Sequence, residues 1–288
     1  MRLALLIARL PLSVLYRLAW LLYVIAYYLL SYRYKVVYHN LQHAYPEKSQ
    51  AELQSIARQF YRYLAEWVVE ILKLPALSAD EIKQRCRITD NDAFAQLQAE
   101  KHGAMVLTAH LGNWEWAGQR VGLALDQPLS VVYKQLSNKT VNRFMNHVRT
   151  CFGNEIADMR EISRKLMKTH ERNLVSSYLA DQSPLRRSAG YWPTFMNRPA
   201  PFFTGPAKAA VKLNLPVYYG HIERVKQGYY QVTFHKLAEA CKDHSPEAIT
   251  EAYVRHLEAS LKLQPANWLW SHRRWKKTHL APQYQDTD

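Results

Sequence analysis

The 288-residue sequence is poor in cysteine and in the features that divide a chain into separate domains. Its three cysteines, Cys86, Cys151 and Cys241, lie far apart and form no Cys-x-x-Cys pair. This argues against a disulfide framework and a zinc site, and it suits a reducing compartment. No Gly/Ser/Pro-rich linker, internal repeat or low-complexity segment interrupts the chain. We therefore expect one large domain, residues 36–288, behind a short N-terminal segment.

Acidic residues are also scarce relative to basic ones. The chain has 38 lysines and arginines against 24 aspartates and glutamates, which gives a formal net charge of +14. A surplus of this size indicates an anionic partner. Nucleic acid, an anionic membrane face and an acidic protein all remain open on charge alone.

Residues 3–30 are the most apolar part of the chain. Arg9 and Arg17 interrupt this part and leave residues 18–30 as its longest uncharged run. That run is short of the ~20 apolar residues that cross a bilayer. Because no small-residue cleavage site follows, we do not interpret it as a removed signal peptide.

Several tyrosines gather near the end of this apolar part, as aromatic residues do at membrane interfaces. They are Tyr23, Tyr27, Tyr28, Tyr32 and Tyr34. We predict that residues 1–35 form a membrane anchor, which either spans the bilayer or lies in its interface. The cations Arg33 and Lys35 favour a cytoplasmic position for the domain that follows.

A strand, a tight turn and a helix are predicted around His110. The apolar run at residues 104–107 has the length of a strand, and apolar residues recur with helical spacing after Asn113, a good N-cap. On one continuous helix His110 and Glu115 would lie about 140° apart. Across a turn, however, the Glu115 carboxylate could fold back onto the imidazole, fix its tautomer and leave the other nitrogen free to take a proton. Such a pair would activate a hydroxyl for attack on an acyl group.

Strand-like and helix-like segments alternate along the chain, which predicts an α/β fold with a mixed, largely parallel central sheet flanked by helices. We expect further strands at residues 129–133 and 174–179, and a hairpin at 216–222 and 229–234. We expect helices at residues 49–72, 138–152, 162–171, 207–213 and 246–263. His110, Lys134 and Asp181 follow strand-like runs, and reactive groups gather at the carboxyl ends of parallel strands. We therefore expect these three residues in a common site.

Several blocks of the sequence resemble one family. They are His-Leu-Gly-Asn-Trp-Glu at residues 110–115, Tyr133-Lys134, Arg149, Asp181-Gln182, residues 201–205, and Trp-Leu-Trp-Ser-His-Arg-Arg-Trp-Lys at residues 268–276. Together they resemble the late acyltransferases of lipid A biosynthesis, the lauroyl/myristoyl transferases. These belong to the wider group of His-x4-acid glycerolipid acyltransferases.

The resemblance implies an acyltransferase at the cytoplasmic face of a bacterial inner membrane. It would move a fatty acyl chain from acyl-acyl carrier protein to a hydroxyl of a Kdo-bearing lipid A precursor, with His110 as general base and Glu115 steadying the ring. It would need no metal or bound cofactor. Its partners would be the acidic carrier protein, an anionic glycolipid and the membrane, and no nucleic acid. The alternative is a lysophospholipid or glycerolipid acyltransferase, which would use the same chemistry.

The resemblance also implies a set of substrate-binding residues: Gly112, Asn113, Tyr133, Lys134, Arg149, Asp181, Gln182 and Arg273. Arg149 would hold a phosphate or developing negative charge, and backbone N–H groups near Gly112 or a nearby cation would stabilise the oxyanion. Arg273 and Arg274 would contact anionic substrate or membrane. The family usually has Asp-Gln-Asp where this chain has Asp181-Gln182-Ser183. Asp181 is thus the one carboxylate of that block, with a catalytic or a structural role.

Overall fold

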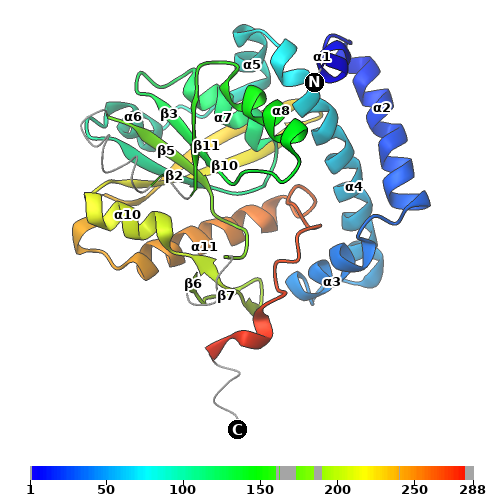
Figure 1. The fold of residues 1–288 in the computed structure, drawn as a ribbon. Helices are drawn as coiled ribbons and strands as arrows, with labels where there is room; N and C mark the ends of the chain where they lie inside the picture. Colours follow the sequence, from blue (N-terminus) through cyan, green and yellow to red (C-terminus); the bar gives the residue numbers. More distant parts are fainter. Residues whose placement is uncertain (1, 160–161, 163–172, 185–189, 240, 283–288) are drawn as a thin grey trace.

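Strands from both halves of the chain form one mixed sheet in the computed structural model, which describes residues 2–159, 162, 173–184, 190–239 and 241–282 (Figure 1). The strand order is β1-β11-β10-β2-β5-β3-β4. The strands are β1 (Cys86–Ile88), β2 (Ala104–Thr108), β3 (Leu129–Tyr133), β4 (Glu155–Asp158), β5 (Val175–Leu179), β10 (Val217–Lys226) and β11 (Tyr229–Ala238). From β10 to β4 all neighbours are parallel, whereas β11 is antiparallel to β10. The predicted α/β fold with a largely parallel sheet is confirmed.

Helices cover both faces of this sheet (Figure 1). One face carries α5 (Ala79–Arg85), α6 (Asp92–Ala99), α7 (Trp114–Gly122) and α8 (Lys139–Thr150), and the other carries α10 (Gly205–Leu213) and α11 (Pro246–Leu263). Strand β2 packs against the helices on both faces of the sheet, because successive side chains of a strand point to opposite faces. Its Met105 and Leu107 pack with α10 and α11, whereas Ala104 and Val106 pack with α7. All five residues of β2 are buried, as expected for a central parallel strand.

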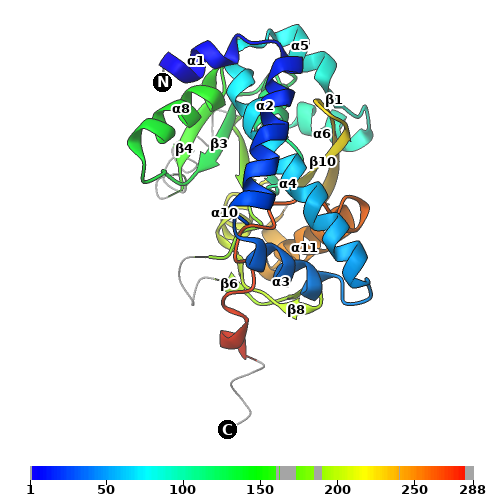
Figure 2. The ribbon, with the colours of Figure 1, turned by 90° about the vertical axis from the view of Figure 1, so that its right-hand side faces the viewer.

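The N-terminal quarter of the chain is helical and packs along one side of the sheet. It contains α1 (Arg2–Ala8), α2 (Leu12–Val24), a π-helical turn (Ile25–Leu29), α3 (Tyr34–Ala44) and the long α4 (Gln50–Lys73). Helix α4 begins with a capping box, in which Ser49 and Glu52 each bond the other's backbone N–H. Helix α2 lies along α4 (Figure 2), with Leu15 and Ala19 packed on Ala65 and Val69.

The outward side of α2 is strongly apolar. The segment Leu12–Leu29 has a mean hydropathy of 1.5 and is long and apolar enough to cross a membrane, by length and composition alone, with 11% of it buried. Its exposed large apolar side chains are Val14, Leu18, Trp20, Leu21, Leu22, Tyr28 and Leu29. An exposed apolar surface of this kind suggests membrane association. A domain boundary after residue 35 stays a prediction.

The predicted elements outside the N-terminal segment agree with the structure to within a few residues, and the helix predicted for residues 246–263 has the same bounds as α11. Strand β4 was not predicted. The helix predicted for residues 162–171 lies outside the described residues, apart from Ile162. Two small antiparallel pairs follow β5: β6 (Gly190–Tyr191) with β9 (Phe202–Phe203), and β7 (Thr194–Phe195) with β8 (Arg198–Pro199).

Candidate active site

The site lies at the carboxyl ends of three adjacent parallel strands, β2, β5 and β3. Thr108 and Leu179 are register partners at the ends of β2 and β5. His110 and Asp181 each follow two residues later, so the two strands deliver them to the same place. Lys134 follows β3, the next strand along. The expected gathering at this edge of the sheet is therefore present.

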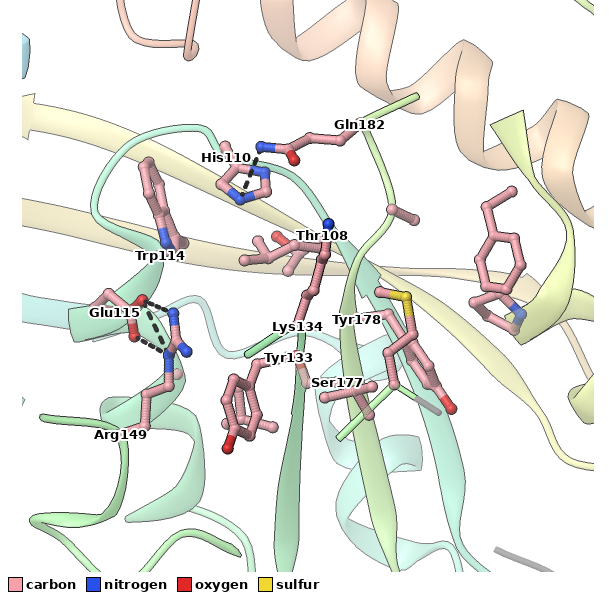
Figure 3. Close-up of a pocket in the computed structure, with 18 of the residues that line it drawn as sticks. Thr108, His110, Trp114, Glu115, Tyr133, Lys134, Arg149, Ser177, Tyr178 and Gln182 are labelled. Atoms are coloured by element: carbon pink, nitrogen blue, oxygen red, sulfur yellow. Dashed lines mark hydrogen bonds and ion pairs between the residues drawn. The ribbon is translucent and has the colours of Figure 1, made fainter. Parts of the chain in front are cut away.

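His110 is held by a buried carboxylate. Its Nδ1 lies 2.7 Å from Oδ1 of Asp181, and the other oxygen, Oδ2, accepts a 2.8 Å hydrogen bond from Trp268 Nε1. Asp181 is 1% exposed. The ring of Trp114 meets the imidazole edge-on at 5.0 Å between centroids. These contacts fix the plane of the ring and leave Nε2, which lies 3.4 Å from Gln182 Nε2, on the pocket side (Figure 3).

The electrostatics of this pair keep Asp181 ionised. Burial by itself would raise the pKa of the Asp181 carboxyl, but the neighbouring His110 and the hydrogen bonds from His110 and Trp268 outweigh burial and lower the pKa to about 2. The carboxylate is then an acceptor only, so Nδ1 of His110 carries the shared hydrogen. Nε2 is left as the nitrogen that can accept a proton from a substrate.

The predicted contact between Glu115 and His110 is wrong. Glu115 lies in the first turn of α7 and faces α8, where Arg149 Nη2 donates to its Oε1 at 2.8 Å and Nε to both oxygens at 3.2 Å. Figure 3 shows this ion pair apart from His110, with Trp114 between them in this view. The sequence spacing allowed the turn to fold Glu115 back. Instead the strand register brings Asp181 to the ring.

The Glu115–Arg149 pair ties α7 to α8. The side chains of Glu115 and Arg149 are 5% and 12% exposed. Gln119, one turn after Glu115, donates from Nε2 to the carbonyl of Arg149 at 2.7 Å. The Arg149 guanidinium also lies over the ring of Tyr133, 5.3 Å from its centroid. Its hydrogen-bonding edge is thus largely committed to Glu115, and the pair shapes one wall of the pocket.

A cavity of about 710 Å³ opens beside His110. Six of the predicted site residues line it: His110, Glu115, Tyr133, Lys134, Arg149 and Gln182. Its apolar lining includes Val131, Val132, Leu136, Met159, Leu179 and Phe203. Lys134 extends toward the His110 end of this cavity in Figure 3. The cavity combines a proton acceptor, a cation and an apolar wall, which suits a substrate with a charged end and a hydrocarbon chain.

Gly112 and Asn113 do not line the cavity; they build the turn after His110. Gly112 has φ +58, and a Cβ there would lie 2.8 Å from the side chain of Ile222, so glycine is required. Its N–H donates to the carbonyl of Asn267 at 2.9 Å, so this N–H is not one of the groups near Gly112 that are free to stabilise an oxyanion. Asn113 is fully buried and caps α7 through Trp116 N.

The C-terminal block, residues 268–276, contacts the segment around His110. Leu111 and Trp268 form an isolated β-bridge, and Leu269 N donates to the carbonyl of His110 at 3.1 Å. Arg273 is exposed and does not line the cavity. Arg274 is fully buried, which corrects its predicted contact with membrane or substrate.

Arg274 instead organises the loop after Asp181. Its Nη1 donates to Ser183 Oγ at 3.2 Å, its Nη2 donates to the carbonyl of Pro201 at 2.9 Å, and its guanidinium lies over Phe202. The departure from Asp-Gln-Asp at Ser183 therefore has a local explanation, because Ser183 Oγ also donates to the carbonyl of Arg274.

Sequence reasoning missed the partners that position His110. Trp268 was recognised as part of a block, but its bond to Asp181 spans 87 positions of the chain. His272 lines the cavity, and burial, with the charges of Arg274 and His110, lowers its pKa to about 4. No local sequence pattern marks either role. Within the described residues, no group of three or more His, Cys, Asp or Glu side chains is placed to hold a metal ion.

An imidazole–carboxylate pair at the carboxyl edge of a parallel sheet, beside a partly apolar pocket, is an arrangement that an α/β acyltransferase could use for general base catalysis. The family model described as bacterial lipid A biosynthesis acyltransferase matches residues 2–277. The chain belongs to this family and is an acyltransferase of the lipid A type.

Two curated proteins are similar to this chain. One is the lipid A biosynthesis lauroyltransferase of Escherichia coli (strain K12), which is 22% identical over 276 residues, covering 94% of this chain and 88% of the relative. The other is the phosphatidylinositol mannoside acyltransferase of Mycolicibacterium smegmatis (strain ATCC 700084 / mc(2)155), 23% identical over 213 residues, covering 72% and 67%. Both are acyltransferases by name.

Proposed function

We propose that this enzyme transfers a fatty acyl chain from acyl-acyl carrier protein to a hydroxyl of a Kdo-bearing lipid A precursor. One observation carries the proposal: the ring of His110 is held at Nδ1 by Asp181, and its Nε2 faces a cavity large enough for an acyl chain. The family membership supports an acceptor of the lipid A type.

In the proposed reaction, the His110 imidazole acts as the general base. Nε2 of His110 takes the proton of the acceptor hydroxyl while its oxygen attacks the thioester carbonyl of the donor. The ester C–O bond forms, the C–S bond breaks, and the thiol of the carrier protein leaves with the proton returned by His110. Asp181 stabilises the imidazolium in between, since it is already ionised and hydrogen-bonded to Nδ1. The dyad is thus His110–Asp181, and Glu115 has another task.

A cation in the cavity stabilises the oxyanion in this mechanism. Gly112 N–H is engaged elsewhere. Lys134 is exposed, lines the cavity and extends toward His110, so its ammonium is our candidate for the developing negative charge (Figure 3). Glu115 and Arg149 form the wall against which the substrates are aligned, and Tyr133 and Gln182 complete the polar lining.

The surroundings of the site suit both substrates. The net charge of +14 favours docking of an acidic carrier protein and an anionic glycolipid. The exposed apolar side of α2 favours attachment to the inner membrane, and the cytoplasmic face is the side where the carrier protein would be met. No cofactor enters the proposed reaction.

A second candidate acceptor is a phospholipid-based glycolipid or a lysolipid. The similarity to a phosphatidylinositol mannoside acyltransferase favours it, since that relative carries a different acceptor in its name. The imidazole chemistry would be unchanged, so the acceptor and not the mechanism separates the two candidates.

Mass spectrometry of the outer-membrane lipid tests the proposal. Cells that lack this protein should accumulate lipid A that is lighter by one secondary acyl chain, and the gene should restore the full mass. The matched control is His110→Ala, which should remain membrane-bound but fail to restore it. An unchanged lipid A mass together with an altered glycerophospholipid profile would favour the second acceptor. Hydrolysis of the donor with no acylated lipid under any acceptor would identify a thioesterase instead.

A further inference from the structure

A buried glutamate, Glu70, lies at the meeting point of the apolar helix α2, helix α4 and the turn after His110. Its side chain is fully buried and accepts three hydrogen bonds. Tyr16 donates to Oε1 at 3.0 Å, while Asn113 Nδ2 and Tyr230 donate to Oε2 at 2.7 and 2.6 Å. Such a group is costly to bury, so its partners are expected to be specific.

One bond to the Glu70 side chain and one to its backbone carbonyl hold the turn that carries His110. Asn113 is the N-cap of α7: its Oδ1 accepts from Trp116 N at 3.1 Å while its amide donates to Glu70. The indole Nε1 of Trp116 donates to the carbonyl of Glu70 at 3.0 Å. A shift of Glu70 would therefore move Asn113, the N-cap of α7, which lies three residues after His110.

A second residue of α4 supports the same turn. Tyr63, seven positions before Glu70 and so on the same side of the helix, donates from its hydroxyl to the carbonyl of Gly112 at 2.5 Å. Helix α4 thus holds Gly112 and Asn113 from one face, and the position of the imidazole depends on this face.

The bond from Tyr16 links Glu70 to the membrane-facing helix α2. Tyr16 lies on α2 next to Leu15, which packs on α4, while the outward side of α2 exposes residues such as Trp20 and Leu21. Helix α2 is therefore linked to the catalytic turn through one buried side chain, by way of Tyr16, Glu70 and Asn113.

We propose that Glu70 is a positioning residue that couples the membrane-facing helix α2 to the His110 turn. It does not line the cavity, so its proposed role is to act through Asn113. It sets the position of Asn113 and thereby of His110, so the placement of α2 at the bilayer and the geometry of the dyad depend on each other. This role rests on the proposed function, whereas the resonance measurement described below can be made without it.

The hydrogen bond between Glu70 and Asn113 can be tested by exchanging its donor and acceptor. Asn113→Asp keeps an N-cap acceptor but sets a second carboxylate against Glu70, which should displace the turn. Glu70→Gln alone keeps one acceptor oxygen for Asn113 and should be mild. In the double variant Glu70→Gln/Asn113→Asp, the new amide donates to the new carboxylate, so the pairing is restored with donor and acceptor exchanged.

The readout is the ring Nδ1–H resonance of His110 in the full-length protein, assigned by its loss in His110→Ala, together with kcat and KM. We expect Asn113→Asp to shift the resonance and lower kcat at least about tenfold, since small misplacements are expensive in catalysis. KM for both substrates should hold, because neither residue lines the cavity. The double variant should recover the resonance and most of kcat. A double variant no better than Asn113→Asp would overturn the proposal.

The link to α2 has its own matched pair. Tyr16→Phe removes one bond to Glu70 and should lower kcat about threefold to fivefold and shift the same resonance. Tyr28→Phe removes an exposed hydroxyl from the π-helical turn that follows α2, where it makes no bond to Glu70. This variant should change neither kcat nor the resonance. Equal behaviour of the two variants would overturn the coupling. If the wild-type protein acylated no lipid, the proposed function would be wrong. The resonance shifts would still show whether α2 is coupled to the His110 turn.

Discussion

The site contains two pairs of a carboxylate with a nitrogen base, and the pairs differ in whether a nitrogen of the base is left free. In one, a carboxylate 1% exposed, Asp181, holds one nitrogen of His110 and leaves the other on the cavity side. In the other, Glu115 takes a forked pair of bonds from Arg149, and the two side chains largely satisfy each other. A guanidinium keeps its proton at any ordinary pH, whereas an imidazole exchanges one. We therefore propose that the first pair moves protons, whereas the second shapes the wall of the cavity.

Removal of the charge on Asp181 is the strongest test of this comparison. Asp181→Asn keeps the size of the side chain but no longer stabilises the imidazolium or enforces the tautomer with hydrogen on Nδ1. By analogy with other imidazole–carboxylate pairs, we expect kcat to fall by about 10³-fold or more. Steady-state kinetics with a thioester donor and lipid acceptor measures it. The division of roles fails if this variant keeps more activity than Glu115→Gln.

Glu115→Gln should have the next largest effect on activity and a large effect on stability. It leaves the buried Arg149 without its charge partner, and breaking a buried pair costs about 3–5 kcal/mol of unfolding free energy. Displacement of the cavity wall should lower kcat/KM by about 10²-fold. Denaturant unfolding and kinetics on the same preparations give both numbers.

The double variant Glu115→Gln/Arg149→Met sharpens this result. With the charge of Arg149 also removed, much of the lost stability should return, because the cost lies in the unpaired cation. If Glu115 instead took part in proton transfer, the double variant would stay as inactive as His110→Ala.

Much of this architecture follows from local patterns. The apolar runs before His110, Lys134 and Asp181 and the N-cap at Asn113 are short-range signals, so the strands, the turn and α7 were predicted closely. Which carboxylate contacts His110, Glu115 or Asp181, could not be predicted from a local pattern. It depends on the register of Thr108 with Leu179, which pairs segments 71 residues apart and which no spacing in the sequence reveals. The same holds for Glu70, whose partners come from α2, the catalytic turn and β11.

Trp268→Phe should have a smaller effect on the dyad than either substitution above. It removes the 2.8 Å bond to Oδ2 of Asp181 but keeps an aromatic ring in the core. A hydrogen bond to a charged group is worth about 1.5–3 kcal/mol, so kcat should fall by about tenfold. Trp270→Phe is the control, because its indole bonds the carbonyl of Pro265, away from the dyad. Equal losses in the two variants would show that packing, and not the bond to Asp181, matters.

The smallest expected effect is a dependence of stability on acid pH that belongs to the dyad. The pKa of Asp181 is lowered from 3.8 to about 2 in the folded protein, so the unfolded chain binds this proton first as pH falls. Stability from Asp181 is therefore complete above about pH 4 and is lost as pH falls toward about 2, a difference of about 2 kcal/mol. Urea unfolding of wild type and Asp181→Asn should show a gap that is constant above pH 4 and narrows below it. A gap that widens in acid would mean that His110 does not hold this carboxylate in the folded state.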